Sequence, residues 1–396
     1  MMEKYEVVVI GGGAAGICAA ISKARTGGSV IICEKTTQLG KKILATGNGR
    51  CNLLNDNFNE TYYNHAARNL VKSIFYKFGK FEILGFFSSL GLEIYSQEGR
   101  IFPITNQASS VLKVLEIELR RLSVPVEYDF CCDQVSFSKS GIVVSSKNGK
   151  RIVCRKVIIT GGGKTYPALG SDGSVYDIAR QLGHTLVEPV PSAVPLVVKD
   201  NLCQALQGQR IFAAASIIID GRKSEEVKGE LLFTKYGLSG TCILDVSEEI
   251  SIAINRQHKK NVFVAVDLVP FLNKEQLTSR LQNRKKEKAF ADEMLVGILP
   301  NKLCVALKDL FENDDIDAAV NSLKDTRFKI SGTRSWNEAE FTAGGISTDE
   351  VNTETLESKL HKGIYFAGEV LDVNGRRGGY NLGWAWASGH VAGQTL

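Results

Sequence analysis

A glycine-rich turn near the N-terminus has the residue spacing that binds the pyrophosphate of a dinucleotide. The turn reads GGGAAG and lies between a β-branched run at 6–10 (EVVVI) and a small-residue helical stretch at 17–25. In such a unit Gly11 permits the tight turn, Gly13 lets a pyrophosphate approach the backbone, and Gly16 lets helix and strand pack closely. The helix start adds unpaired N–H groups and the positive end of a dipole. The turn is therefore a candidate anion site.

A carboxylate follows where a ribose contact is expected. A second buried strand is predicted over 29–33, and it ends at Glu34. A carboxylate there accepts hydrogen bonds from a ribose 2′ hydroxyl and repels a 2′ phosphate. Strand, turn, helix, second strand and terminal acid together predict dinucleotide binding rather than a purely structural glycine turn. They leave open which dinucleotide binds.

The segment 40–52 (GKKILATGNGRCN) bears on that choice. It is punctuated by glycines, carries three cations and has no periodic apolar face, so it is predicted to be a loop. In FAD enzymes of the glutathione-reductase-like superfamily this region passes under the pyrophosphate and flanks the isoalloxazine ring, whereas an NAD-dependent dehydrogenase does not usually need it. The alternative is a solvated basic loop. Cys51 has no partner cysteine at short spacing, which favours a small packed thiol over a redox role.

Two later blocks repeat the pattern of a buried strand followed by glycines. The strand KVIIT at 156–160 runs into Gly161, Gly162 and Gly163, and the strand at 363–367 precedes glycines at 378–379 and a helix over 382–391. Such strand ends are where a cofactor is expected, although the first could be an ordinary strand-to-loop turn. The first block is not a second GxGxxG, because a tyrosine stands at the third glycine position.

The glycines before the last helix would also place backbone N–H groups against negative charge. If that charge is the N1–C2=O edge of a flavin, the helix dipole stabilises the reduced anionic form by about 0.3 to 2 kcal/mol and favours hydride acceptance at N5. The flavin itself would carry the chemistry.

The middle of the chain reads as an insertion. Three prolines within 188–195 indicate a linker, and short alternating segments at 215–219, 230–234 and 262–266 predict an antiparallel domain. The stretch 274–311 has helical spacing. Its basic run at 284–288 is more typical of a solvated helix face than of a nucleic-acid site.

Composition excludes several classes of protein. The chain has 396 residues, 23% charged and 44% hydrophobic, with a net charge of +5, which excludes a disordered or collagen-like protein and makes nucleic acid an unlikely partner. Its nine cysteines form no CxxC or metal-ligand spacing and are predicted to be reduced, mostly buried thiols, with no metal site. The glycines within 7–21 argue against a signal peptide, and no run is long enough for a membrane span. We expect a soluble, cytoplasmic protein without a membrane partner.

Six blocks, in order along nearly the whole chain, resemble the HI0933-like family of NAD(P)/FAD-dependent, aminoacetone-oxidase-like flavoproteins. They are GGGAAG with Glu34, TGNGRCN (46–52), GRIFPITNQASSV (99–111), TGGGKTYPALGSDGS (160–174), LLFTKYGLSG (231–240) and FAGEVLDVNGRRGGYNLGWAWASG (366–389).

The resemblance implies an α/β fold: a Rossmann-like FAD-binding domain of the glutathione-reductase-like type, with an inserted β-rich domain and a small helical subdomain. The FAD domain would comprise 1–190 and 337–396, the β-rich domain 191–272 and 325–336, and the helical subdomain 273–324.

The resemblance also implies which residues bind FAD: the pyrophosphate and ribose contacts, the loop toward the ring, the adenosine side, and the residues closing over ribityl and ring. They are Gly11, Gly13, Ala14, Ala15, Gly16, Glu34, Lys35, Gly40, Lys42, Gly47, Asn48, Gly49, Arg50, Cys51, Asn52, Val135, Thr160, Gly161, Gly162, Gly368, Glu369, Asp372, Gly378, Gly379, Tyr380 and Asn381. The chain departs from the family at Lys235 and Thr241, where members commonly carry histidine and proline, so a substrate cannot be carried over by analogy.

The predicted function is an FAD-dependent oxidoreductase that transfers hydride between flavin N5 and a small-molecule substrate or NAD(P)H, the latter as a transient electron donor. Two alternatives stay open: an NAD-dependent dehydrogenase that uses the first glycine turn directly, and a flavin-dependent protein that modifies or associates with RNA. The histidines fall in no cofactor-adjacent motif, so no catalytic acid or base is assigned. The sequence does not determine the oligomeric state.

Overall fold

The chain folds into two compact units. The computed structural model describes residues 4–395. The first unit combines the two ends of the chain, Met1–Pro189 and Phe341–Leu396, and the second is the intervening segment Val190–Glu340.

A sheet with the strand order β6-β2-β1-β9-β8-β7 forms the centre of the first unit, and β19 also pairs with β9. Its strands are β1 (Lys4–Ile10), β2 (Val30–Cys33), β6 (Val126–Glu127), β7 (Cys132–Ser138), β8 (Gly141–Ser146), β9 (Arg151–Ile159) and β19 (Ile364–Phe366). Strands β6, β2, β1, β9 and β19 run parallel, whereas β7 and β8 are antiparallel. The parallel strands are buried β-branched runs, as expected for a sheet covered on both faces.

Strand β9 joins the two ends of the chain. Its first half pairs with β8, and its second half, from Val157 to Ile159, pairs with β19 from the C-terminal segment. Its other edge pairs with β1 over nearly the full length of both strands. The N-terminal and C-terminal segments therefore belong to one sheet.

Helices cover this sheet, and a small second sheet of β3 (Leu54–Asn55), β5 (Arg100–Pro103) and β4 (Ile94–Gln97) lies in the same unit. The helices are α1 (Ala14–Arg25), α2 (Lys41–Ala45), α3 (Arg68–Lys77), α4 (Lys80–Ser89), α5 (Ala108–Arg121), α6 (Ser174–Gln181) and α12 (Tyr380–Gln394).

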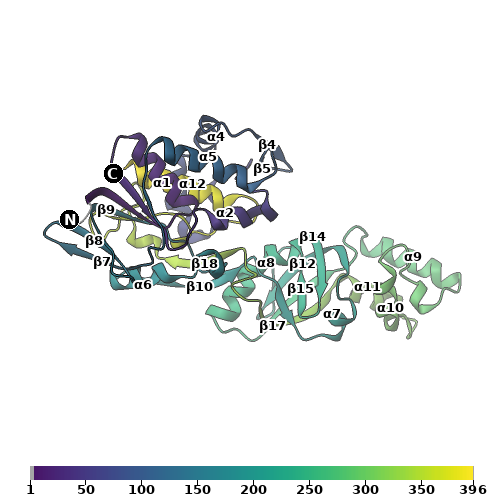
Figure 1. Ribbon diagram of the computed structural model, residues 1–396. Helices are drawn as coiled ribbons and strands as arrows, with labels where there is room; N and C mark the ends of the chain where they lie inside the picture. The colour runs from purple at the N-terminus through teal and green to yellow at the C-terminus, as the bar shows by residue number, and fades with distance from the viewer. Residues whose placement is uncertain (1–3, 396) are drawn as a thin grey trace. The chain divides into compact units, whose positions relative to one another are not determined.

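Helices α1 and α12 come from opposite ends of the chain and lie side by side (Figure 1). The contact is close because glycines face backbone: a Cβ on Gly389 would overlap the carbonyl oxygen of Ala15, and one on Gly393 would overlap that of Ala19. The buried thiol of Cys18 also donates to the carbonyl oxygen of Trp386 at 3.3 Å. Small residues thus let the two helix backbones approach each other.

The second unit is built on a closed antiparallel barrel. Strands follow one another in the order β12-β14-β15-β11-β17-β16, and β16 pairs back to β12. The barrel strands and the short β13 are β11 (Leu196–Val198), β12 (Arg210–Ile219), β13 (Arg222–Lys223), β14 (Val227–Thr234), β15 (Gly237–Ser239), β16 (Val262–Asp267) and β17 (Thr326–Thr333). Closure leaves these six strands without a free edge.

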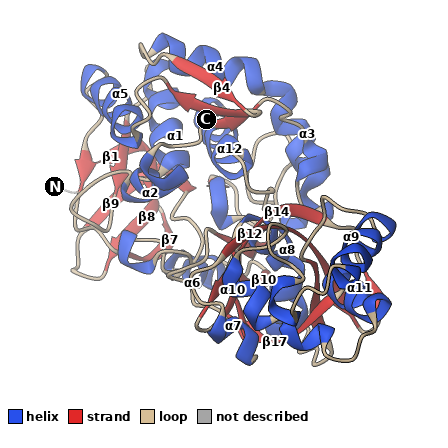
Figure 2. Cartoon of the chain, turned by 90° about the vertical axis from the view of Figure 1, so that its right-hand side faces the viewer, coloured by secondary structure: helices blue, strands red, loops and turns tan. Residues whose placement is uncertain are grey.

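Helices pack onto this barrel and share its core. They are α7 (Asn201–Ala205), α8 (Thr241–Ser251), α9 (Lys274–Lys286), α10 (Asn301–Ala306) and α11 (Ile316–Lys324). Leu277 of α9 and Leu323 of α11 belong to the same apolar cluster as Phe233 and Val264 of the barrel. Helices α9 and α11 lie side by side (Figure 2), where Lys274 donates to Asn321 at 2.8 Å. The finer division of this unit into a β-rich domain and a helical subdomain stays a prediction.

One local prediction was wrong, and another segment is more regular than its composition indicates. The segment 40–52 is not all loop, because Lys41–Ala45 form α2 and Thr46–Gly49 form a 3-10 turn. A five-residue helix with one buried side chain, Ile43, is too short to show a periodic apolar face. The proline-rich segment, predicted as a linker out of the first domain, lies where the chain passes from the first unit to the second, after Pro189. It forms most of β10 (Leu186–Ser192), which pairs with β18 (Phe341–Ile346) in a two-stranded sheet. An edge strand tolerates proline, which has no N–H to donate.

The α1–α12 contact predicts that two glycine-to-alanine substitutions change the free energy of unfolding by different amounts. Gly389→Ala places its Cβ against the backbone of Ala15 and should lower the free energy of unfolding by about 1 to 3 kcal/mol. Gly85→Ala, at an exposed position of α4, meets no atom within 4 Å and should be neutral or stabilising by about 0.5 to 1 kcal/mol. Urea denaturation measures both, and equal effects would contradict the packing described.

Candidate cofactor and active site

Parallel strands from both ends of the chain finish at one edge of the sheet. Gly11 follows β1, Glu34 follows β2, Thr160 follows β9 and Ala367 follows β19, and neighbouring strand ends are in register. The buried Thr160 hydroxyl lies 2.9 Å from the carbonyl oxygen of Ile10 and 2.8 Å from that of Gly11. Ligands of α/β sheets bind outside such carboxyl ends, so this edge is the candidate site.

The predicted pyrophosphate turn has the three glycine environments that its role requires. Gly11 has a φ of 104°, and its Cβ would lie 2.8 Å from the Cα of Gly161. A Cβ on Gly16 would overlap the carbonyl oxygen of Gly11, whereas one on Gly13 would meet nothing within 4 Å. Gly11 and Gly16 are thus required by packing, while the backbone at Gly13 is open. No side chain caps α1, so its first N–H groups can receive an anion.

Glu34 is buried and held by two backbone donors. Its Oε2 accepts from Gly12 N and its Oε1 from Thr36 N, both at 2.8 Å. A carboxylate has lone pairs for further hydrogen bonds, so this geometry positions Glu34 without using up its capacity. The neighbouring Lys35 is turned to Asp172, with Nζ 2.6 Å from Oδ1. Burial would raise the pKa of Asp172, but hydrogen bonds from Lys35 and Ser174 lower it.

A polar network joins four segments at this edge. Lys42 Nζ of α2 lies 2.7 Å from Glu369 Oε2 and also donates to Thr165, which follows β9. The other oxygen of Glu369 accepts from the backbone N–H of Thr342 in β18 at 2.8 Å and from the Thr165 hydroxyl at 3.3 Å. Lys42 and Glu369, both predicted site residues, are therefore brought together, and Thr165 and Thr342 were not foreseen.

The turn after α2 is strained. Gly47 and Asn48 both have left-handed backbone angles, with φ of 57° and 54°, and Cys51 has a φ of 60°. Non-glycine residues in this region cost about 1 to 3 kcal/mol each and cluster at functional sites. The Arg50 guanidinium carbon lies 4.4 Å from the ring centroid of Phe102. Burial raises the pKa of the Cys51 thiol to about 12, so this cysteine is protonated at neutral pH and is no nucleophile.

Three buried polar atoms in the first unit have no hydrogen-bond partner among the described residues: Asn52 Oδ1, Ser171 Oγ and the Tyr176 hydroxyl. Ser171 lies beside Gly162, whose Cβ would be 3.0 Å from its Oγ. Burial, then the charges of Glu369 and Asp372, raise the pKa of Tyr176, so its hydroxyl remains a donor. Buried polar groups are normally paired, so these atoms fit a polar ligand such as FAD.

Ser171 and Tyr176 were not predicted as site residues. Ser171 lies within the glycine-rich block 160–174, where the glycines drew attention to the backbone. Tyr176 stands on the amphipathic helix α6, where a buried aromatic residue is typical of packing. Only its unpartnered hydroxyl distinguishes it from a core tyrosine.

Four predicted site residues, 378–381, lie at the start of α12. Gly378 and Gly379 have φ of 119° and 100°, and no side chain caps the helix. The Tyr380 ring stacks on Tyr62, with centroids 4.7 Å apart. The Asn381 side chain is engaged with Gly375, donating to its carbonyl oxygen at 2.8 Å and accepting from its N–H at 2.9 Å. Asn381 therefore holds the preceding loop in place.

The remaining predicted residues vary in position. Asp372 is buried, and Gly368, with a φ of 78°, donates its N–H to Ser388 Oγ at 2.9 Å. Val135 lies apart in β7, opposite Val144 and two strands from β9 in the sheet order.

Two of the five histidines, His65 and His258, are exposed, whereas His184 and His390 pack against other side chains. His184 contacts Glu350 Oε2 at 3.0 Å and Ser358 Oγ at 2.8 Å. His390 stacks on Phe78, and burial lowers its pKa to about 4.

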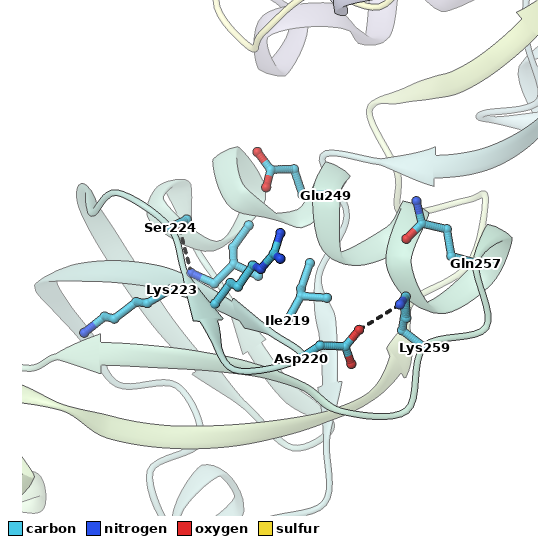
Figure 3. Close-up of a pocket in the computed structure, with 9 residues that line it drawn as sticks. Ile219, Asp220, Lys223, Ser224, Glu249, Gln257 and Lys259 are labelled. Carbon is cyan, nitrogen blue, oxygen red and sulfur yellow. Dashed lines mark hydrogen bonds and ion pairs between the residues drawn. The ribbon is translucent and has the colours of Figure 1, made fainter.

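The second unit has a separate hollow of about 620 Å³ beside the β12–β13 hairpin (Figure 3). Charged side chains dominate its lining, and Lys259 pairs with Asp220 at 2.7 Å across it. Both partners are about half exposed, with 42% and 49% of their side-chain surface accessible. The lining also includes Ile217 and Ile219, but none of its polar side chains is buried, so we do not assign chemistry to it.

Within residues 4–395, no cluster of three histidine, cysteine or carboxylate side chains is arranged to hold a metal ion. None of the helices in that range combines the length and apolar character needed to cross a bilayer. All nine cysteines are free thiols, and all but Cys131 are buried.

A family model described as the HI0933-like protein Rossmann domain matches residues 5–395. The chain belongs to this family. It is 38% identical over 402 residues to a 3-dehydro-bile acid delta(4,6)-reductase of Clostridium scindens, covering 98% of both chains. It is 28% identical over 406 residues to a ribosomal RNA dihydrouridine synthase of Escherichia coli, covering 100% of this chain and 98% of that protein.

Solved structures agree with this fold. A flavocytochrome c3 fumarate reductase superposes with a TM-score of 0.51 at 15% identity, covering 99% of this chain and 78% of that one. The Mycobacterium smegmatis protein Sdh1 also gives a TM-score of 0.51, at 14% identity, covering 99% of this chain and 68% of that one. Family members are FAD-binding flavoenzymes, and this chain is an FAD-dependent oxidoreductase. The predicted family, fold class and enzyme class are confirmed.

The Lys42–Glu369 pair predicts strong coupling between two distant parts of the chain. Both side chains are mostly buried, with 25% and 21% of their surface exposed. A double-mutant cycle of Lys42→Met and Glu369→Gln, measured by urea denaturation, should give a coupling of about 1 to 3 kcal/mol. The exposed pair Lys259–Asp220, tested with Lys259→Met and Asp220→Asn, should give less than about 1 kcal/mol. Similar couplings for the two pairs would contradict a network role.

Proposed function

We propose that this enzyme reduces a carbon–carbon double bond conjugated to a carbonyl group in a small molecule of steroid type. The observation that carries the proposal is the 38% identity, over 98% of both chains, to a reductase whose name specifies a 3-oxo bile acid with double bonds beginning at C4. A C4 double bond beside a C3 ketone is an enone, whose β-carbon accepts hydride.

The second relative supports the same reaction type on a different molecule. Dihydrouridine differs from uridine by two hydrogens across the C5–C6 bond, which is conjugated to the C4 carbonyl. Two relatives with different substrates thus share the reduction of a polarised double bond. This shared chemistry is a firmer basis than either substrate alone.

The residues at the sheet edge would hold FAD along its length. The open backbone at Gly13 and the N–H groups of Ala14, Ala15 and Gly16 would face the pyrophosphate, and Glu34 would accept from the ribose. Unpartnered Asn52, Ser171 and Tyr176 would add hydrogen bonds. The segment 40–52, fixed through Lys42 to Glu369, and the start of α12 would enclose the ring end.

Bound FAD supplies a two-electron carrier between a reduced nicotinamide and the substrate. NAD(P)H gives up a hydride, the β-carbon of the enone gains it, and the α-carbon takes a proton from water or an acidic side chain, leaving NAD(P)⁺ and a saturated ketone. The N–H groups at the start of α12 would stabilise negative charge at the ring edge. The chain positions the reactants and excludes water, while the cofactor determines the redox chemistry.

Reduction of uridine in RNA is the second candidate function, because of the dihydrouridine synthase relative. The distribution of charged side chains favours a small-molecule substrate over RNA. Basic and acidic side chains are equal in number over 273–324, the helical segment that would be the basic surface for RNA. RNA binding through phosphates needs a concentration of cations.

The function is tested with the purified holoenzyme under anaerobic conditions. NADPH or NADH should bleach the flavin absorption, and 3-oxo-4-cholenoate should restore it while gaining two hydrogens, detected by mass spectrometry. Ribosomal RNA from a strain lacking the enzyme serves as the competing substrate. Dihydrouridine formation without reduction of the enone would favour the RNA function and contradict the proposal.

We expect removal of the unpartnered hydroxyls to lower the affinity for FAD without lowering the stability of the apoprotein. Tyr176→Phe and Ser171→Ala should weaken FAD binding about two- to tenfold, yet leave the apoprotein as stable as the wild type or more so, because each removes an unpaired buried group. The control is Ser216→Ala in the barrel, whose hydroxyl donates to Ala265 at 3.4 Å and which should leave FAD affinity unchanged. Fluorescence titration and urea denaturation measure the two quantities. Loss of apoprotein stability with unaltered FAD affinity would refute this assignment.

A further inference from the structure

The surplus positive charge of the chain is confined to one unit. Residues 190–340 contain equal numbers of basic and acidic side chains, so the net charge of +5 arises entirely in the unit that carries the candidate site. Several arginines elsewhere in the described chain are paired with carboxylates, among them Arg25, Arg121, Arg180, Arg210 and Arg334. Some other arginines of the first unit have no such partner among the described residues.

Two such arginines flank the stacked tyrosines at the start of α12. Arg100, exposed at the start of β5, and Arg376, exposed in the loop before α12, form no ion pair with any carboxylate of residues 4–395. The guanidinium carbon of Arg376 lies 5.8 Å from the ring centroid of Tyr62. Arg100 Nε lies 3.8 Å from where a Cβ on Gly378 would be, and a ring carbon of Tyr380 lies at the same distance from that point.

Glycine at position 378 keeps this place open. Its φ of 119° disfavours any side chain, and its carbonyl oxygen accepts from the Asn55 amide at 2.9 Å. Arg100 and the Tyr380 ring therefore lie close to a backbone position that is held in place and carries no side chain. The loop before it is fixed as well, because Arg376 N donates to the carbonyl oxygen of Tyr62 at 3.0 Å.

The tyrosines complete a set of hydrogen-bond donors. Tyr380 is buried, and burial together with the neighbouring Tyr62 raises its pKa to about 12, so its phenol is protonated at neutral pH. The stacked rings of Tyr62 and Tyr380 also offer an apolar surface. Guanidinium groups bind carboxylates with paired, charge-assisted hydrogen bonds, and aromatic faces pack on hydrocarbon.

We propose that Arg100 and Arg376, with the phenols of Tyr62 and Tyr380, bind a carboxylate carried by the substrate, so that the enzyme selects amphipathic acids over neutral enones of the same shape. This inference rests on the proposed function, whose substrate class it narrows. A carboxylate is favoured over RNA phosphate because two arginines match the paired hydrogen bonds that one carboxylate accepts, whereas a polynucleotide needs an extended cationic path.

The test uses a ligand that cannot be reduced further. Calorimetric titration of the oxidised holoenzyme with the saturated acid 3-oxo-5β-cholanoate should give binding about tenfold tighter than with its methyl ester. Arg376→Gln and Arg100→Gln should each remove most of this preference without changing ester binding, and Arg376→Lys should restore part of it. The matched control is Arg151→Gln, because Arg151 is exposed at the opposite end of β9.

The outcomes separate this inference from the proposed function. Equal affinity for acid and ester, or a preference that survives both glutamine variants, overturns the carboxylate site even if both enones are reduced. Arginine-dependent binding of the acid without reduction of 3-oxo-4-cholenoate leaves the carboxylate site standing and refutes the enone reductase. Tight binding of a uridine-containing RNA that is lost in the same two variants also overturns the inference, since the arginines would then serve phosphate.

Discussion

The pairing of β9 with strands from both ends of the chain is the constraint on which the rest of this structure depends. One edge of β9 holds β1, and its second half holds β19, which is separated from β9 in sequence by the whole second unit. Because all three strands run parallel, their carboxyl ends meet at one sheet edge. The helices that follow β1 and β19 then pack against each other through glycines, so two uncapped helix starts belong to one unit.

This arrangement explains how the chain tolerates a large insertion. Because the barrel of the second unit is closed, each of its strands is paired on both edges by another barrel strand. The barrel and the helices α9 and α11 enclose one apolar core. The barrel needs no strand from the first unit to complete its sheet. The chemistry of the site is correspondingly concentrated in the first unit, where Lys42 and Glu369 connect α2 to the turn after β19.

The sequence predicted the parts of the fold that depend on local pattern. Few other structures require the spacing of the run at 6–10, the glycine turn and Glu34. The apolar, β-branched composition of 156–160 and 363–367 predicts buried strands. Closure of the barrel was not predictable, because the pairing of β12 with β16 depends on contacts between residues far apart in sequence. The prolines at 188–195 indicated where the chain leaves the first unit but did not reveal β10, because an edge strand can omit backbone N–H groups just as a linker can.

The sequence predicted the site residues whose role depends on backbone geometry. It did not reveal those whose role depends on a side chain without a hydrogen-bond partner. Gly11 and Gly16 are recognisable because a side chain at either place would collide with backbone, and Gly13 is recognisable by its spacing from them. Ser171 and Tyr176 look like ordinary polar and packing residues until their unpartnered hydroxyls are seen in three dimensions. The arginines at 100 and 376 are equally inconspicuous in sequence, because only the fold brings both of them to the tyrosine pair.

Amide hydrogen exchange in the presence and absence of FAD tests most directly whether the two ends of the chain hold one cofactor. Residues 13–17 at the start of α1 and 379–383 at the start of α12 should both become more protected as FAD binds with one equivalent per chain, while the barrel strands stay unchanged. Protection at only one of these helix starts, or at neither while FAD is bound, would contradict the account.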